Sequence, residues 1–244
     1  KQTVMTTLAK VIISTVLGLL MMSCNFDMNF GVNGNGNVTT TERSLDGSFS
    51  AIKVSRGLDV YITQTNTESV SVEADENLQD IIMVEIEGDV LNIYAEENIG
   101  TSKSKKIMVS LDDLTKISTT SGSDVFSTNT INTNTIEIKT TSGSDLELDI
   151  NAESIDCSST SGSHVKLSGK TNKLYASATS GSDISAQDLS AVSCQVKATS
   201  GANITVNTSE ELIAKASSGG DINYYGNPKK VETSDNVSGS IRKR

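Results

Sequence analysis

The sequence lacks tryptophan and contains one histidine, one proline and few aromatic residues. Aromatic residues make up 4% of the 244 positions, so the chain has few platforms on which nucleobases could stack. Lys and Arg total 20 against 30 Asp and Glu, which gives a formal net charge of −10. Nucleic-acid binding needs a concentration of basic residues, so this balance argues against a nucleic-acid partner. His164 is the single candidate for a Ser-His-Asp triad or a His-rich zinc site.

The first 24 residues have the features of a secretion signal. Two lysines precede an apolar run over residues 11–22, which is shorter than the roughly 20 apolar residues that a membrane-spanning helix needs. Such a run, with positive charge before it and small residues near its end, is typical of a signal peptide. The segment Leu20-Met21-Met22-Ser23-Cys24 resembles the lipobox of bacterial lipoproteins, whose cysteine is diacylated and begins the mature chain. We therefore expect a lipoprotein signal peptide over residues 1–23.

On this interpretation Cys24 is lipidated and anchors the protein to a membrane of the cell envelope, expected to be the outer membrane. Dual acylation is sufficient for stable anchoring. The alternative is an ordinary secretory signal in which Cys24 is incidental. The following residues are rich in Gly, Asn and Thr and show little periodicity, so we expect a flexible tether over residues 24–47.

A Ser-Gly-Ser-Asp motif recurs through the second half of the chain. Its strict and looser copies contain Gly122, Gly143, Gly162, Gly181, Gly201 and Gly219. A fixed period of about 20 residues is the signature of a solenoid. The residues seven, five, three and one before each glycine, and three after it, are apolar or small, whereas the positions between them are polar. Because side chains of a strand alternate between two faces, we expect these odd positions to face a common interior.

The repeat predicts an all-β fold, a right-handed parallel β-helix (solenoid) of about 20-residue coils. We assign the regular coils to residues 117–244 and a β-rich, less regular part to residues 48–116, which includes a degenerate first coil around Gly57. Residues 64–105 are expected to form an insertion or a hairpin layer against one end. Cys157 and Cys194 fall at inward positions, which favours small buried side chains over a disulfide.

One polar column collects acidic side chains. The residue two places after each glycine is Asp124, Asp145, His164, Asp183, Asn203 or Asp221. Stacked coils place such side chains about 4.8 Å apart, so these six form a candidate ligand or ion face on which adjacent carboxylates could share calcium. His164 and Asn203 interrupt the column and leave one adjacent carboxylate pair, Asp124 and Asp145. We therefore favour capping of the bends by Asp, Asn and Ser side chains that bond local backbone N–H groups, with no metal or cofactor.

Three features together resemble a known bacterial family. They are the segment Phe49-Ser50-Ala51-Ile52-Lys53-Val54-Ser55-Arg56-Gly57-Leu58-Asp59-Val60, the segment Glu76-Asn77-Leu78 and the Ser-Gly-Ser-Asp coils. The chain resembles the "putative auto-transporter adhesin, head GIN domain" proteins over roughly residues 48–241. The resemblance implies an envelope protein with a β-helical fold, and it supplies no catalytic motif that maps onto this chain.

We expect a lipid-anchored envelope protein with a non-enzymatic role at the cell surface. That role is binding, adhesin-like or structural, directed at a glycan or protein ligand. The alternative is a β-helical carbohydrate-active enzyme, either a polysaccharide lyase or a hydrolase. Such an enzyme needs clustered acid and base residues that break the repeat. The main breaks are His164, Tyr175, Phe126 and the Tyr224–Tyr225 pair, and they suggest no such cluster.

Overall fold

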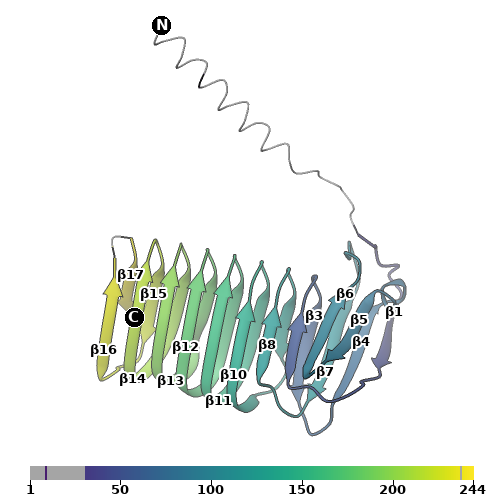
Figure 1. Cartoon of the computed structure of the whole chain (residues 1–244), viewed down its shortest axis with the longest axis horizontal. Coiled ribbons are helices and arrows are strands. Elements are labelled where there is room, and N and C mark those ends of the chain that lie inside the picture. The colour runs from purple at the N-terminus through teal and green to yellow at the C-terminus, as the bar shows by residue number, and fades with distance from the viewer. Residues whose placement is uncertain (1–8, 10–30, 237) are drawn as a thin grey trace. The chain divides into compact units, whose positions relative to one another are not determined.

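The computed structural model describes residue 9, residues 31–236 and residues 238–244. Residues 31–244 form one compact unit, in which the strands lie side by side along a single stack (Figure 1). The predicted signal peptide, apart from Ala9, and the predicted anchor Cys24 lie outside the described residues. In the part of the chain that the structure describes, no helix is long and apolar enough to cross a membrane.

The described unit is built from strands, as the repeat predicted, with a single 3-10 turn, η1 (Glu76–Leu78). The N-terminal strands are β1 (Val38–Arg43), β2 (Ala51–Val54), β3 (Asp59–Gln64), β4 (Ser69–Asp75), β5 (Ile82–Glu87), β6 (Val90–Ala95) and β7 (Lys105–Leu111). The repeats supply β8 (Lys116–Thr119), β9 (Asp124–Ser127), β10 (Ile131–Thr140), β11 (Asp145–Thr160), β12 (His164–Thr179), β13 (Asp183–Thr199), β14 (Asn203–Ser217), β15 (Asp221–Tyr225), β16 (Lys230–Asp235) and β17 (Ser240–Lys243).

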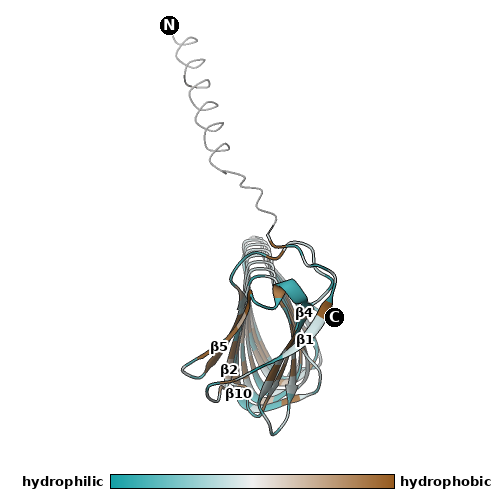
Figure 2. Cartoon of the chain, turned by 90° about the vertical axis from the view of Figure 1, so that its right-hand side faces the viewer, coloured by the Kyte–Doolittle hydropathy of each residue, from teal (hydrophilic) through white to brown (hydrophobic). Residues whose placement is uncertain are grey.

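Each coil has two walls, joined by the Ser-Gly turn at one edge and by a bend at the other. Wall 1 contains β3, β7, β9, β15, β17 and the first halves of β11–β14, whereas wall 2 contains β2, β6, β8, β16 and the second halves of β10–β14. Neighbouring coils pair in parallel, with Leu146 opposite Val165 on wall 1 and Ile155 opposite Leu174 on wall 2. Viewed along the stack, the walls enclose a narrow interior (Figure 2). The predicted β-solenoid is confirmed, with coils of about 19 residues.

The interior is a continuous apolar core, as the alternation predicted. Ile136, Ile155 and Leu174 occupy one inward column of wall 2 and are buried. Cys157 and Cys194 are buried in this core as free thiols, which confirms their predicted role as small packing residues. Burial raises the pKa of Cys194 to about 12 and that of Cys157 well above its ordinary value. Both cysteines therefore remain protonated and unreactive at neutral pH.

The serine before each turn glycine does not face the interior, contrary to the alternation. Ser161 and Gly162 have φ values of 57° and 72°, the successive left-handed residues of a type I′ turn. The chain reverses over these two residues, and the side chain of Ser161 is exposed. The serine after the glycine is buried instead, as at Ser144 and Ser163. The prediction failed because strict alternation holds only while the backbone is extended.

The stacking order at the N-terminal end differs from the chain order. β2 and β3 lie directly against β8 and β9, so the first coil continues the regular stack. The intervening residues place β6 and β7 on the other side of this coil, again in parallel. β5 then pairs antiparallel with β6, and β4 pairs antiparallel with β7. These antiparallel strands close the N-terminal end of the solenoid.

The segment before this coil is not the flexible tether that composition predicted, at least from Gly31 onward. β1 pairs antiparallel with β4, with Thr41 opposite Val72. The buried carboxylate of Asp75 accepts hydrogen bonds from the backbone N–H groups of Gly36, Lys103 and Ser104. The polar, Thr-rich composition suggested a flexible segment. Such a segment can nevertheless form an ordered strand where it covers the edge of a sheet.

Candidate functional site

The predicted polar column exists on wall 1, on the outer face beside the Ser-Gly turns. Register pairing places its members in successive coils, in the order Asp124, Asp145, His164, Asp183, Asn203 and Asp221. The column also contains Asp59, which pairs in register with Asp124. We had expected one adjacent carboxylate pair, and the structure has a run of three. Asp59 follows Gly57 by two residues, the offset of the column, but only the stacking of β3 on β9 shows that it lies next to Asp124.

Negative charge accumulates where these three carboxylates meet, and Lys105, whose Nζ lies 3.7 Å from Oδ1 of Asp59, offsets part of it. Burial raises the pKa of Asp124 above its ordinary value of 3.8, and the flanking carboxylates of Asp59 and Asp145 raise it further. Further along the column, the imidazole Nδ1 of His164 lies 3.1 Å from Oδ1 of Asp183. Burial raises the pKa of Asp183, while His164 opposes the shift. His164 therefore interrupts the like-charge column and contacts one of its members.

The hydrogen bonds that close the turns come from the buried serines and not from the Asp column. Oγ of Ser144, Ser163 and Ser182 donates to the carbonyl of the residue three positions earlier, at 2.7, 2.8 and 2.9 Å. Within the described coils, the column's carboxylates bond no backbone group of their own turn. The predicted capping role therefore belongs to serine, whose short side chain lies beneath the turn, whereas the aspartates point outward.

The described residues contain no group of three or more His, Cys, Asp or Glu side chains arranged to hold a metal ion. One of the predicted breaks in the repeat, Phe126, lies beside the column on wall 1. Its ring stacks on Tyr61 with 5.3 Å between the centroids. Phe126, which interrupts the repeat, thus forms an aromatic pair with Tyr61 of the first coil.

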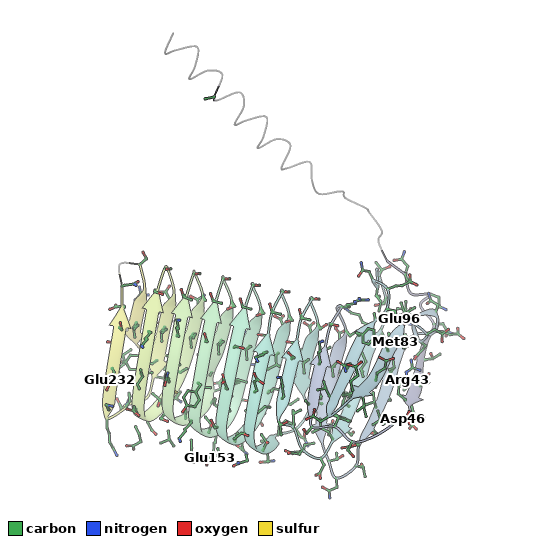
Figure 3. All side chains as sticks on the ribbon, viewed as in Figure 1. Arg43, Asp46, Met83, Glu96, Glu153 and Glu232 are labelled. Carbon is green, nitrogen blue, oxygen red and sulfur yellow. The ribbon has the colours of Figure 1, made fainter. Side chains whose placement is uncertain are left out.

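A wide concavity of the described unit lies at the bends, at the edge opposite the Ser-Gly turns. We name it the bend groove; its volume is about 560 Å³. Five successive coils line it with Thr133, Asn151, Ala152, Glu153, Lys170, Thr171, Asn172, Ser190, Ala191, Val192, Asn207 and Ser209. Glu153 marks this edge in Figure 3, and its Oε2 accepts a 2.6 Å hydrogen bond from the amide of Asn172. The repeat does not predict this groove, because the bends carry no fixed motif.

Comparisons with known proteins agree with this architecture. A "putative adhesin" from Bacteroides fragilis has a TM-score of 0.82 at 20% identity, over 87% of this chain and 100% of its own. A "putative lipid binding protein" from Parabacteroides distasonis has a TM-score of 0.71 at 23% identity, over 87% of this chain and 99% of its own. These likenesses show the fold alone. No curated protein matches the chain.

The family model described as "Putative auto-transporter adhesin, head GIN domain" matches residues 48–228. This range includes the first coil, the inserted strands of the N-terminal end and the regular coils up to Pro228. The match therefore extends over most of the chain and over nearly all of the solenoid. The chain belongs to the "putative auto-transporter adhesin, head GIN domain" family.

Proposed function

We propose that this protein is a non-enzymatic binding protein of the cell envelope, with an adhesin-like role at the cell surface. The observation that carries the proposal is the bend groove, which extends across five coils and presents amide, hydroxyl and small apolar groups together with one acidic and one basic side chain, Glu153 and Lys170. Such a lining suits a long ligand that is rich in hydroxyl groups, because a few placed polar groups orient a ligand along an otherwise neutral surface. The ligand we propose is therefore a glycan chain that lies along the stack.

The same groove argues against a glycoside hydrolase. Glycoside hydrolases use two carboxyl groups that flank the scissile bond. Glu153 is the one carboxylate among the described residues that line the groove, and it accepts a hydrogen bond from Asn172. A lone carboxylate in this position can orient a sugar but lacks the second group that hydrolysis requires.

The proposal includes attachment to the membrane through Cys24. Its support is the sequence from Leu20 to Cys24, which resembles a lipobox. Two acyl chains bind a bilayer stably, whereas one chain binds it reversibly. Palmitate labelling that persists in a Cys24→Ser variant would contradict this part of the proposal.

A glycan array tests the binding role. The chain from Asn25 onward lacks the predicted signal peptide and the acylation site and contains the whole compact unit, so it is suitable as the soluble probe. We expect it to bind extended neutral glycans, and the double variant Asn151→Ala with Asn172→Ala to bind them at least about tenfold more weakly. Each lost hydrogen bond is worth about 1 kcal/mol, and about 1.4 kcal/mol corresponds to a tenfold change in affinity.

The matched control is the double variant Thr141→Ala with Thr160→Ala, which removes two polar side chains at the Ser-Gly edge. It should bind like the parent chain. Equal losses of glycan affinity in both double variants would contradict the proposal. So would binding to proteins alone, or cleavage of the bound glycan.

A further inference from the structure

Wall 2 carries two neighbouring lysines that have no internal partner. Lys197 and Lys215 are opposite one another in register and both are exposed. Lys116 and Lys139, also on wall 2, form ion pairs with Glu137, whereas neither Lys197 nor Lys215 forms one with any described residue. Like charges on directly opposed positions destabilise a sheet. In a chain with a net charge of −10, this pair forms a local positive site. An external anion bound there would offset the repulsion between the two lysines.

A recess adjoins the two lysines, and we name it the wall 2 recess. Its volume is about 310 Å³, and its lining includes Tyr175, Ser177 and Gln195 besides the lysines. The recess arises because Ser177 occupies the column position that the next two coils fill with lysine. The short serine leaves space between the Lys197 side chain and the Tyr175 ring. Tyr175 interrupts the repeat and is 42% exposed.

The lining defines the chemistry of a ligand. The ring of Tyr175 and the side chain of Ile213 offer apolar surface to the face of a sugar ring, while the phenol and the Gln195 amide supply hydrogen bonds. The ammonium groups of Lys197 and Lys215 act as point charges for a carboxylate or sulfate. Asp156 lines the recess two coils away from Lys197, in register with Tyr175, and repels a second anionic group there.

We infer that the wall 2 recess binds a single acidic sugar residue, with its anionic group between Lys197 and Lys215 and its ring against Tyr175. A smaller recess of about 150 Å³ shares Tyr175, Gln195 and Ile213 and extends this surface towards the bends. The inference rests on the proposed glycan-binding role and adds a sugar class to it. A polyanion such as nucleic acid is a poor fit, because two lysines supply too few phosphate contacts.

The test uses the chain from Asn25 onward and three matched probes: an oligosaccharide that contains glucuronic acid, its carboxyl-reduced form, and a sulfated form of the reduced sugar. We expect the acidic or the sulfated probe to bind at least about tenfold more tightly than the reduced one, since charged hydrogen bonds are worth about 1.5–3 kcal/mol. The comparison of these two probes tells carboxylate from sulfate. The double variant Lys197→Gln with Lys215→Gln should abolish that preference and leave binding of the reduced probe unchanged.

The matched control is Lys116→Gln with Lys139→Gln, which removes the same charge from wall 2 at lysines already paired with Glu137. It should keep the preference. Equal loss in both double variants overturns the inference, and so does binding to vesicles of anionic lipid without binding to the acidic sugar. If neutral glycans bind through the bend groove and no probe shows a charge preference, this inference fails while the proposed function stands.

Discussion

Asp124 lies between Asp59 and Asp145 in successive coils, and its neighbours make its ionisation unfavourable. Burial and these two carboxylates raise its pKa above 3.8. The folded chain therefore binds this proton more tightly than the unfolded chain. The free energy of unfolding consequently falls as the pH rises from 3.8 through the raised pKa. At neutral pH the ionised Asp124 destabilises the fold.

Replacing Asp124 with Asn should therefore stabilise the protein at neutral pH. Screened charge interactions at partly exposed sites are worth about 0.2–1 kcal/mol, so we expect Tm to rise by about 1–3 °C. The gain should vanish below pH 3.8, where the carboxyl is protonated. Asp221→Asn is the control, because Asp221 stands between Asn203 and Ser240 and has no flanking carboxylate in register. Equal gains at both sites, or a gain at Asp124 that persists in acid, would contradict the argument.

The sequence predicted which residues form the polar column but not what they do there. Alignment on the glycines gave the outward position of Asp145 and the inward position of Ile155, because extended strands alternate strictly. It could not reveal that Ser161 turns outward and Ser163 inward, since this depends on two left-handed residues. The alignment places Asp59 two residues after Gly57, but it could not show that Asp59 lies beside Asp124, because a long-range stacking contact makes them neighbours.

At the scale of the coil, the Ser-Gly turns and the bends require glycine for different reasons. Gly162, in the Ser-Gly turn, has φ of 72° and open space where a side chain would begin. Gly169, at the bend within β12, has φ of 109°, and an added Cβ would lie 2.2 Å from the carbonyl oxygen of Ile150. The first position requires a backbone conformation alone. The second position requires glycine for two reasons, the left-handed backbone and the close approach of the neighbouring coil.

Gly169→Ala should therefore destabilise the protein more than Gly162→Ala. A left-handed alanine costs about 1–2 kcal/mol, which is the loss expected for Gly162→Ala. At Gly169 the Ile150 backbone must also move, so we expect a loss above about 3 kcal/mol. Urea unfolding of the two variants measures the difference. Equal losses, or a larger loss at Gly162, would show that the approach of Ile150 does not constrain the bend.

The repeat predicted the coils better than the strands. It placed the Ser-Gly turns, because their residues are periodic, but the strands β11–β14 run through the bends, which have no common motif. The bend groove was missed for the same reason. Its lining combines residues from five coils whose identities differ, so its chemistry appears only after the coils are stacked.

At the scale of the whole solenoid, each regular coil contacts its immediate neighbours, and stability is approximately a sum of such nearest-neighbour terms. A destabilising substitution at one end should therefore leave the distant coils folded. The N-terminal end depends on Asp75, whose carboxylate accepts hydrogen bonds from Gly36, Lys103 and Ser104 and so joins the segment before β1 to the end of β4. These backbone hydrogen bonds, chiefly that from Ser104, hold the pKa of Asp75 below 3.8.

Asp75→Asn should release the N-terminal end and leave the distant coils intact. Three N–H donors converge on the Asp75 carboxylate, and an amide would turn its own NH₂ group towards one of them, where no acceptor is available. We expect faster amide hydrogen exchange in β1 and β4, with unchanged protection in β12–β14. Asp80→Asn, at an exposed position in the same part of the chain, is the control and should change neither region. Loss of protection spread evenly along the stack would refute nearest-neighbour stability, because it would mean that the solenoid unfolds as one cooperative block.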